Sequence, residues 1–181
     1  GLVITRTLKA VYPEKERLIF EVGHGCGYMG ALLVADGYAY ASTDTAQAFY
    51  VYQSNLLNEL IPGKFTELVE GGEFGAISSV QPGHALHVPW WKFYSAIPTS
   101  ALTVDAFACN HALAEMHPNS LSFVLKFARM MLTKPDSSFA FEGFGSTIKT
   151  PIWAIAKRFS DLGYSLAHNN ITGCFFVPNE L

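Results

Sequence analysis

The sequence is poor in cysteine and in charge, and it has no long apolar run. Its three cysteines, Cys26, Cys109 and Cys174, are widely spaced and odd in number, which argues against a disulfide framework and fits a reducing cytoplasm. Only 15% of the residues are charged, the net charge is −3 and no Lys/Arg cluster occurs, so no nucleic-acid partner is expected. No apolar run approaches the roughly 20 residues that span a bilayer, and no signal peptide is visible.

What the chain does have is apolar content, because 50% of its 181 residues are hydrophobic. This length and composition predict one globular domain over residues 1–181 with a sizeable core. The chain starts at Gly1, without a methionine, and directly enters what reads as the end of a helix. We therefore expect a longer protein, whose N-terminal lid or substrate region is missing from this sequence.

A glycine-rich turn near the N-terminus is the most informative stretch. Leu18–Val22 has the apolar, β-leaning character of a buried parallel strand. Gly23, Gly25 and Gly27 follow, and Tyr28–Asp36 is compatible with a helix. A strand, a glycine turn and a helix bring a ligand against bare backbone, because glycine has no side chain to block it. The helix start also presents N–H groups without partners.

Two ligand patterns overlap in this turn. Residues 25–30 read GCGYMG and match the dinucleotide pattern G-x-G-x-x-G. Residues 21–27 read EVGHGCG, a pattern in which the acidic Glu21 stands two residues before the first glycine. The strand ends directly on Gly23, which favours the second register. A tight turn without any ligand is the third interpretation.

An acidic residue follows the second predicted strand. Tyr38–Thr43 reads as that strand, and Asp44 lies 21 positions after Gly23. In a βαβ unit, an acid at this point meets the ribose hydroxyls of a bound nucleoside. The alternative is that Asp44 caps the next helix, predicted over Thr45–Leu60. The sequence leaves both roles open.

Two adjacent tryptophans follow a third strand, predicted at Ala76–Val80. Residues 84–91 read HALHVPWW. Tryptophan offers a flat surface that stacks on an adenine or on a sugar face, so Trp90 and Trp91 are candidate ligand contacts. Alternatively, one of them belongs to the core and the other covers the edge of the sheet.

The remaining pattern predicts an α/β fold with a doubly wound, Rossmann-like sheet, mostly parallel with an antiparallel last strand. The final two strands are expected to join at Asn169-Asn170 as a hairpin. The expected elements are strands at Leu102–Cys109, Ser137–Phe141, Tyr164–His168 and Ile171–Val177, and helices at Val3–Val11, Pro118–Leu132 and Pro151–Leu162.

With these pieces placed, the chain resembles the S-adenosylmethionine-dependent class I methyltransferases over nearly its full length. Residues 21–27 resemble motif I of that superfamily, where the acid sits beside the cationic methionine part. Residues 22–53, together with HALHVPWWKF at 84–93 and NHALAEM at 110–116, most resemble the bacterial sugar O-methyltransferases. The sequence has His84 where the superfamily commonly has an Asp.

The resemblance implies S-adenosyl-L-methionine as the cofactor and a small-molecule or glycan acceptor. It places the cofactor-binding residues at Glu21, Gly23, His24, Gly25, Gly27, Asp44, Thr45, His84, Ala85 and Asn110. His24, inside the turn, is expected to face the cofactor carboxylate or solvent. Trp90, Trp91 and His87 are expected on the acceptor side.

Methyl transfer to a hydroxyl requires positioning and a general base. His111, just past the fourth predicted strand, is the first candidate, because imidazole titrates near neutral pH. Glu115, four residues on, would orient it across one helical turn. His117 and His87 are reserve candidates, and His111 has an alternative role as a cap or adenosine contact. No histidine pair has a metal-ligand spacing, so no metal is expected.

Three functions follow in order. The first is a cytoplasmic O-methyltransferase that acts on a sugar hydroxyl of a glycoside or polysaccharide. The second is an NAD(P)-dependent oxidoreductase that uses the G-x-G-x-x-G register. The third is a Rossmann-like binding subunit without catalysis. The sequence predicts neither the oligomeric state nor the identity of the acceptor.

Overall fold

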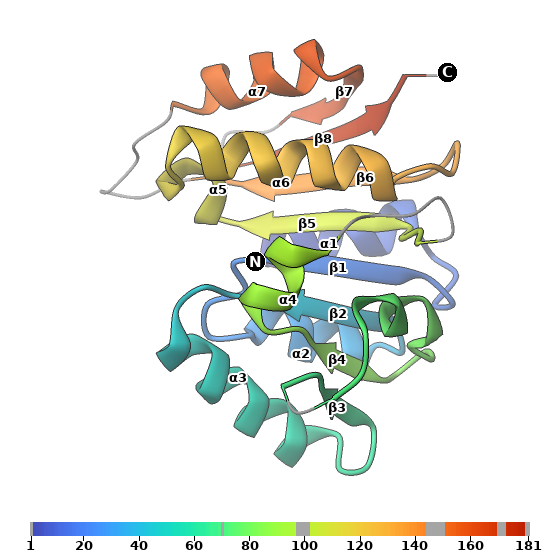
Figure 1. Ribbon diagram of the computed structural model, residues 1–181. Coiled ribbons are helices and arrows are strands. Elements are labelled where there is room, and N and C mark those ends of the chain that lie inside the picture. Colours follow the sequence, from blue (N-terminus) through green and yellow to red (C-terminus); the bar gives the residue numbers. More distant parts are fainter. Residues whose placement is uncertain (1, 70, 97–101, 144–150, 170–172, 180–181) are drawn as a thin grey trace.

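An eight-stranded sheet forms the centre of the computed structural model, which describes residues 2–69, 71–96, 102–143, 151–169 and 173–179. The strand order is β3-β4-β2-β1-β5-β6-β8-β7, and β8 runs antiparallel to both of its neighbours (Figure 1). The strands are β1 (Leu18–Val22), β2 (Ala39–Thr43), β3 (Phe65–Glu67), β4 (Ala85–His87), β5 (Ala106–Asn110), β6 (Ser138–Glu142), β7 (Tyr164–Asn169) and β8 (Gly173–Pro178).

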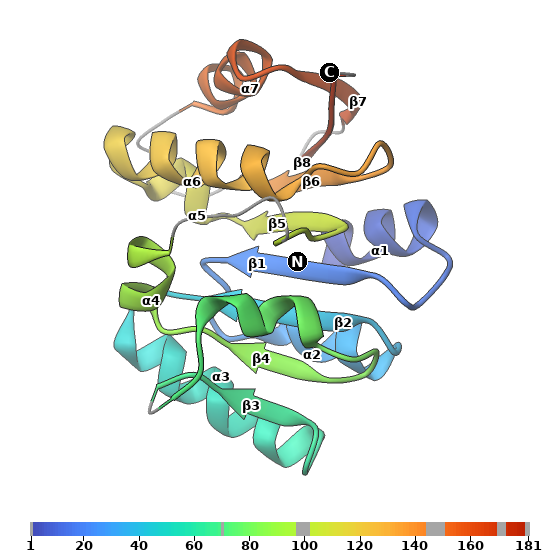
Figure 2. The same cartoon turned by 45° about the vertical axis from the view of Figure 1, so that its right-hand side comes forward.

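Helices cover both faces of this sheet (Figures 1 and 2). The face with α1, α2 and α3 buries one apolar cluster, and the face with η1, α4, α6 and α7 buries another. The helices are α1 (Leu2–Val11), α2 (Tyr28–Ala35), α3 (Gln47–Leu60), α4 (Trp90–Ser95), α5 (Ala112–Glu115), α6 (Pro118–Met131), α7 (Ile152–Asp161) and the 3-10 helix η1 (Phe74–Ser79). The predicted doubly wound, mostly parallel sheet is confirmed.

Two short segments differ from the sequence prediction. Residues 76–80, predicted as a strand, lie in η1 and its end, where Ile77 is fully buried. The place beside β2 is taken by β4, and β3, where the sequence predicted no strand, pairs with β4 as the edge strand. A short apolar run does not reveal its own pairing partner, so tertiary contacts decided between these segments. The strand expected from Leu102 begins only at Ala106, and residue 170 of the predicted hairpin turn lies outside the described residues.

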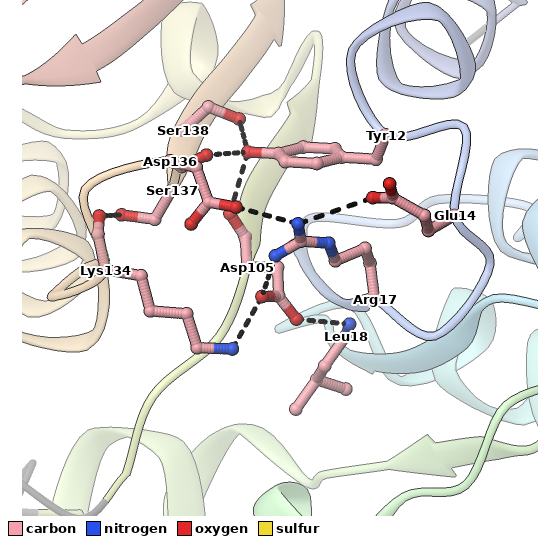
Figure 3. A network of polar contacts seen from close by, with 9 residues as sticks. All are labelled: Tyr12, Glu14, Arg17, Leu18, Asp105, Lys134, Asp136, Ser137 and Ser138. Atoms are coloured by element: carbon pink, nitrogen blue, oxygen red, sulfur yellow. Dashed lines mark hydrogen bonds and ion pairs between the residues drawn. The ribbon is translucent and has the colours of Figure 1, made fainter.

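A polar network joins the amino ends of β1, β5 and β6 (Figure 3). Asp105 Oδ1 accepts hydrogen bonds from Arg17 Nη1 at 3.0 Å and Lys134 Nζ at 2.6 Å. Asp105 Oδ2 accepts the Leu18 backbone N–H at 2.8 Å. Burial alone would raise the pKa of Asp105, but the hydrogen bonds from Lys134, Leu18 and Arg17 outweigh it and lower the pKa. The network therefore holds an ionised carboxylate at the amino ends of these three strands.

We expect Asp105→Asn to lower the free energy of unfolding by about 2 kcal/mol, because a buried charge network loses its common acceptor. The measurement is urea unfolding at pH 7. Asp136→Asn is the matched control, because Asp136 also contacts Arg17, at 2.7 Å, but from a half-exposed position. A loss as large in the control as in Asp105→Asn would contradict the role given to burial.

Candidate functional site

A cavity of about 510 Å³ opens at the carboxyl ends of β1, β2 and β5. The arrowheads of these three strands point to the same side of the molecule, where α4 and α5 also lie (Figure 1). Ligands of open α/β sheets bind at the carboxyl ends of the strands. The cavity is lined by Val22, Gly23, Gly25, Thr43, Asp44, Thr45, Ala46, Phe49, Trp90, Phe93, Tyr94, Asn110, His111, Ala112, Glu115, Met116, His117 and Ser120.

The three glycines of the turn have different tasks, although all have positive φ. A Cβ on Gly23 would lie 2.2 Å from Ala112 Cβ, and one on Gly27 would lie 2.5 Å from Gln53 Cγ. These two glycines are therefore required by packing inside the protein. A Cβ on Gly25, in contrast, would meet nothing within 4 Å. Gly25 lines the cavity, so it is the glycine whose bare backbone is open to a ligand.

Asp44 connects this turn to the start of α3. Its Oδ2 accepts the Gly25 N–H at 3.0 Å, and its Oδ1 accepts the Ala46 N–H at 2.8 Å. The N-cap residue of α3 is Ala46, so Asp44 is not the cap that the sequence offered as an alternative. Asp44 lines the cavity, and each carboxylate oxygen has capacity for a further donor.

Glu21 lies in the interior, on the face of β1 that is covered by α2 and α3. Its Oε2 accepts the Tyr40 hydroxyl at 2.5 Å, and Tyr40 in turn accepts Gln53 Nε2 at 3.2 Å. Among the described groups, Glu21 Oε1 has no hydrogen-bond partner. Burial raises the pKa of Glu21 from 4.5 to about 7, against the opposing hydrogen bond from Tyr40. The chain thus keeps an uncompensated acid two residues before the turn.

This raised pKa predicts that stability falls as the pH rises. The folded state holds the Glu21 proton up to about pH 7, whereas the unfolded chain loses it near pH 4.5. Stability from this group is therefore complete below pH 4.5 and is lost as the pH rises through 7, a change of about 3 kcal/mol. We expect Glu21→Gln to remove most of this slope, measured by urea unfolding from pH 5 to 8 without ligand. Parallel curves for the two proteins would contradict the prediction.

His24 and His87 meet beneath the turn. Their Nε2 atoms lie 2.7 Å apart, and both side chains are buried. Neither lines the cavity, although the sequence placed His24 on the cofactor side and His87 on the acceptor side. Burial lowers the pKa of His24 to about 4, opposed by Asp44, and lowers the pKa of His87 to about 2.

Other expected site residues are distributed between the cavity and the rest of the sheet. His84 and Ala85 lie at the amino end of β4, the end opposite the cavity, because the strand begins later than predicted. Gly27 and Trp91 do not line the cavity, whereas Thr45 and Trp90 do.

An aromatic wall on α4 faces the cavity. Trp90 is 45% exposed and contacts Tyr94 edge to face, with ring centroids 5.9 Å apart. Phe49, from the first turn of α3, is 44% exposed on the same cavity. Phe49 and Tyr94 were not among the site residues predicted from the sequence. The signal for Phe49 was an aromatic residue in the helical turn just after Asp44.

The end of β5 supplies the polar wall. Asn110, His111 and Glu115 all line the cavity, as the sequence placed them. His111 is the only non-glycine residue with a positive φ among the described residues, with φ 68° and ψ −31°. Its backbone N–H donates to Glu142 O at 2.6 Å. Strain of this kind gathers at functional sites.

His117 also lines the cavity, and its protonation pattern is set by the backbone. Its Nδ1 accepts the Asn119 N–H at 3.2 Å as the N-cap of α6. In the neutral ring the proton is then on Nε2. His117 is thereby a hydrogen-bond donor through Nε2 and not a base, which leaves His111 as the stronger candidate of the two.

Within the described ranges, no three His, Cys, Asp or Glu side chains converge as they would around a metal ion. In the same part of the chain, no helix combines the length and apolar character needed to cross a membrane.

No protein-family model matches the chain, and no curated protein matches it in sequence. Solved structures do match its fold. Magnesium protoporphyrin IX methyltransferase from Synechocystis, with bound SAH, is 12% identical with a TM-score of 0.69, over 98% of this chain and 81% of that one. A TehB-like SAM-dependent methyltransferase from Corynebacterium glutamicum is 14% identical with a TM-score of 0.68, over 97% of this chain and 87% of that one.

A third match is the 1,6-didemethyltoxoflavin-N1-methyltransferase of Burkholderia thailandensis, with its substrate and S-adenosylhomocysteine bound. It is 14% identical with a TM-score of 0.61, over 98% of this chain and 77% of that one. The likeness extends over nearly the whole chain, including the antiparallel strands β8 and β7. The chain therefore has the fold of the class I S-adenosylmethionine-dependent methyltransferases.

Proposed function

We propose that this protein is an S-adenosylmethionine-dependent O-methyltransferase whose acceptor is a sugar hydroxyl. The observation that carries the cofactor assignment is the open space at Gly25, beside the carboxylate of Asp44, in a cavity at the carboxyl ends of the strands. The proteins of the same fold described above include two with SAH or S-adenosylhomocysteine bound. A volume of about 510 Å³ lies within the usual range for small-molecule sites.

The residues present fit this cofactor. The turn at Gly23 and Gly25 offers backbone without side chains, and Asp44 has remaining acceptor capacity for ribose hydroxyls. Glu21 adds a buried acid whose Oε1 has no partner among the described groups. With a pKa of about 7, Glu21 is divided between its neutral and charged forms near neutral pH. A positive charge near the turn, as in a sulfonium or ammonium group, favours the charged form, and a pyrophosphate disfavours it.

When bound, the cofactor supplies a methyl group on a sulfonium for in-line displacement by a nucleophile. The chain itself has to bind, orient and deprotonate the acceptor. His111 is the proposed general base, because it lines the cavity from the end of β5 and carries an imidazole, the side chain that most often serves as a general base. Glu115 stands on the same wall and His117 contributes an N–H donor.

The aromatic wall supports a sugar as the acceptor. Trp90 and Tyr94 present ring surfaces to the cavity next to the polar residues Glu115, His117 and Ser120. Sugars have apolar C–H faces, which stack on aromatic rings, and hydroxyl edges, which need hydrogen-bond partners. The combination of flat rings and polar groups on one cavity matches both surfaces of such an acceptor.

A thermal-shift experiment tests the cofactor. We expect S-adenosylhomocysteine to raise the unfolding temperature and NADH to have no effect, because ligands that bind only the native state stabilise it. Stabilisation by NADH alone would favour an oxidoreductase. No response to either S-adenosylhomocysteine or NADH would favour a binding subunit without this cofactor.

The acceptor class is tested separately by methyl transfer. The protein is incubated with S-adenosylmethionine and with matched panels of glycosides, phenols and amines, and products are detected by a mass gain of one methyl group. We expect glycosides to be methylated. We also expect Trp90→Ala to raise the KM for the acceptor more than the KM for the cofactor. Preferred methylation of phenols or amines would overturn the sugar assignment and leave the cofactor assignment standing.

A further inference from the structure

A row of buried donors ends on Glu21, just before the glycine turn. Ser42 Oγ donates to Gln53 Oε1 at 3.0 Å, and Gln53 Nε2 donates to the Tyr40 hydroxyl at 3.2 Å. The Tyr40 hydroxyl donates to Glu21 Oε2 at 2.5 Å. All four side chains are fully buried. The interior therefore supplies one hydrogen bond to one oxygen of this carboxyl group.

The other oxygen, Glu21 Oε1, has no hydrogen-bond partner among the described groups. The ionisable groups around it add no positive charge: Tyr40 and the Cys109 thiol have pKa values raised by burial, and Asp44 is itself an acid. Among the described residues, no Lys, Arg or His side chain lowers the pKa of Glu21. Burial without a cationic side chain favours the neutral form of a carboxyl group, and the pKa of about 7 follows from it.

This acid lies close to the proposed cofactor site, although it does not line the cavity. Val22 and Gly23, the next two residues of the chain, both line it. Asp44, which also lines it, is near enough to raise the pKa of Glu21. A positive charge in the cavity would therefore act on Glu21 partly through protein interior, where charges interact more strongly than in water.

The cofactor and its product differ in this kind of charge. S-adenosylmethionine carries a sulfonium, whereas S-adenosylhomocysteine has lost the methyl group and carries an uncharged thioether. A nearby positive charge lowers the pKa of a carboxyl group. An acid that is divided between its two forms near neutral pH should therefore lose more of its proton to the first ligand than to the second.

We propose that Glu21 is a specificity-determining residue, which makes the site prefer S-adenosylmethionine over S-adenosylhomocysteine. Glu21 releases its proton to solvent when the sulfonium binds, and the carboxylate left behind attracts that charge. With the uncharged thioether in the site, Glu21 keeps more of its proton and the attraction is absent. The inference rests on the proposed function, because it assumes that the cavity binds S-adenosylmethionine.

The pH dependence of the two affinities tests this role. Above pH 7 Glu21 is already charged in the free protein, whereas at lower pH its deprotonation has to accompany binding and subtracts from the affinity. We expect the ratio of the S-adenosylhomocysteine Kd to the S-adenosylmethionine Kd to rise about fivefold or more from pH 5.5 to pH 7.5. The measurement is calorimetry.

Glu21→Gln is the decisive variant, because it keeps the size of the side chain and removes the titrating group. We expect the ratio of the two Kd values to be independent of pH in this variant. Groups such as His111, which line the cavity and also respond to a sulfonium, remain in it. An equal rise of the ratio in the wild type and in Glu21→Gln would overturn the proposal.

The released proton can also be counted. The binding enthalpies of both ligands are measured at pH 7 in phosphate and in Tris, which differ in their enthalpy of ionisation. About half of the free protein holds the Glu21 proton at this pH, so S-adenosylmethionine should release more protons than S-adenosylhomocysteine, by at most about half a proton. Equal release by the two ligands in the wild type would contradict the role of Glu21.

A pair of tyrosine variants tests the proposal should Glu21→Gln not fold. Tyr40→Phe keeps the ring, against which Gly30 packs, and removes the hydroxyl that favours the charged form of Glu21. We expect the pH range in which the Kd ratio rises to move upward. Tyr38→Phe is the control, because this buried hydroxyl donates to Tyr12 O instead. No shift in Tyr40→Phe, or the same shift in both variants, would overturn the proposal.

The two kinds of failure are distinguishable. A folded wild-type protein that binds neither ligand contradicts the proposed function, and this inference falls with it. A wild-type protein that binds both ligands with a Kd ratio independent of pH contradicts only the role of Glu21 and leaves the cofactor assignment standing.

Discussion

Replacing Gly25 with alanine is expected to weaken S-adenosylhomocysteine binding about tenfold or more while the protein stays folded. A methyl group at this position enters open space on the cavity side and meets no protein atom within 4 Å. The loss of affinity therefore comes from the backbone surface that the cofactor needs to approach. The measurement is calorimetric titration with S-adenosylhomocysteine.

Gly63→Ala is the matched control for backbone strain. Gly63 has a φ of 76°, close in kind to the 53° of Gly25, and a Cβ there also meets nothing within 4 Å. Gly63 follows α3 and does not line the cavity. Both variants are expected to lose about 1 kcal/mol of stability, because an L-residue is strained at positive φ. An equal loss of affinity in both would show that Gly25 acts through stability alone.

Removal of the His111 side chain is expected to lower turnover about a hundredfold or more. The acceptor hydroxyl would lose the base that removes its proton, whereas the turn at Gly25 and Asp44 would stay as it is. The Kd of S-adenosylhomocysteine should therefore change little. Turnover is followed by S-adenosylhomocysteine formation with the best glycoside of the acceptor panel.

Two variants of His111 separate the imidazole from the backbone. His111 has a φ of 68°, so His111→Gly relieves strain that His111→Ala retains, and the glycine variant should be more stable by about 1 kcal/mol. Both lack the ring, so both should lose turnover equally. If turnover followed stability across the pair, the backbone would be responsible. If cofactor affinity fell as much as turnover, His111 would be a cofactor contact.

Two buried acids, Asp105 and Asp44, lie at opposite ends of the strands. Asp105 lies at the amino ends of β1 and β5, where three donors converge on its carboxylate. Asp44 lies at the carboxyl end of β2 and lines the cavity. Substitution of the first should therefore lower stability, while substitution of the second should lower cofactor affinity. The position of an acid along the strand, more than its burial, decides between these effects.

Much of the site could be predicted from the sequence because its signals are local. Glycine spacing after an apolar strand predicted the turn, and alternating strands and helices predicted the sheet edge where ligands bind. For the same reason Asp44, Asn110 and His111 were expected at strand ends, and together with Glu115 of α5 they line one cavity. Their roles toward a cofactor or an acceptor remain predictions.

Contacts between distant segments could not be read in this way. The sequence alone does not reveal that Gly23 and Gly27 pack against Ala112 and Gln53, which leaves Gly25 as the open glycine. Nor does it reveal that the strand beside β2 begins at Ala85, so that His84 lies at the amino end of this strand, opposite the cavity.

The sequence by itself therefore determined the fold class, the glycine turn and the location of the cavity at the carboxyl ends of the strands. Only the tertiary structure decided which glycine is exposed, which short segment pairs with β2, and that His24 meets His87. The physical reason is that periodicity and turn chemistry act over a few neighbouring residues, whereas strand pairing and side-chain packing join residues far apart in the chain.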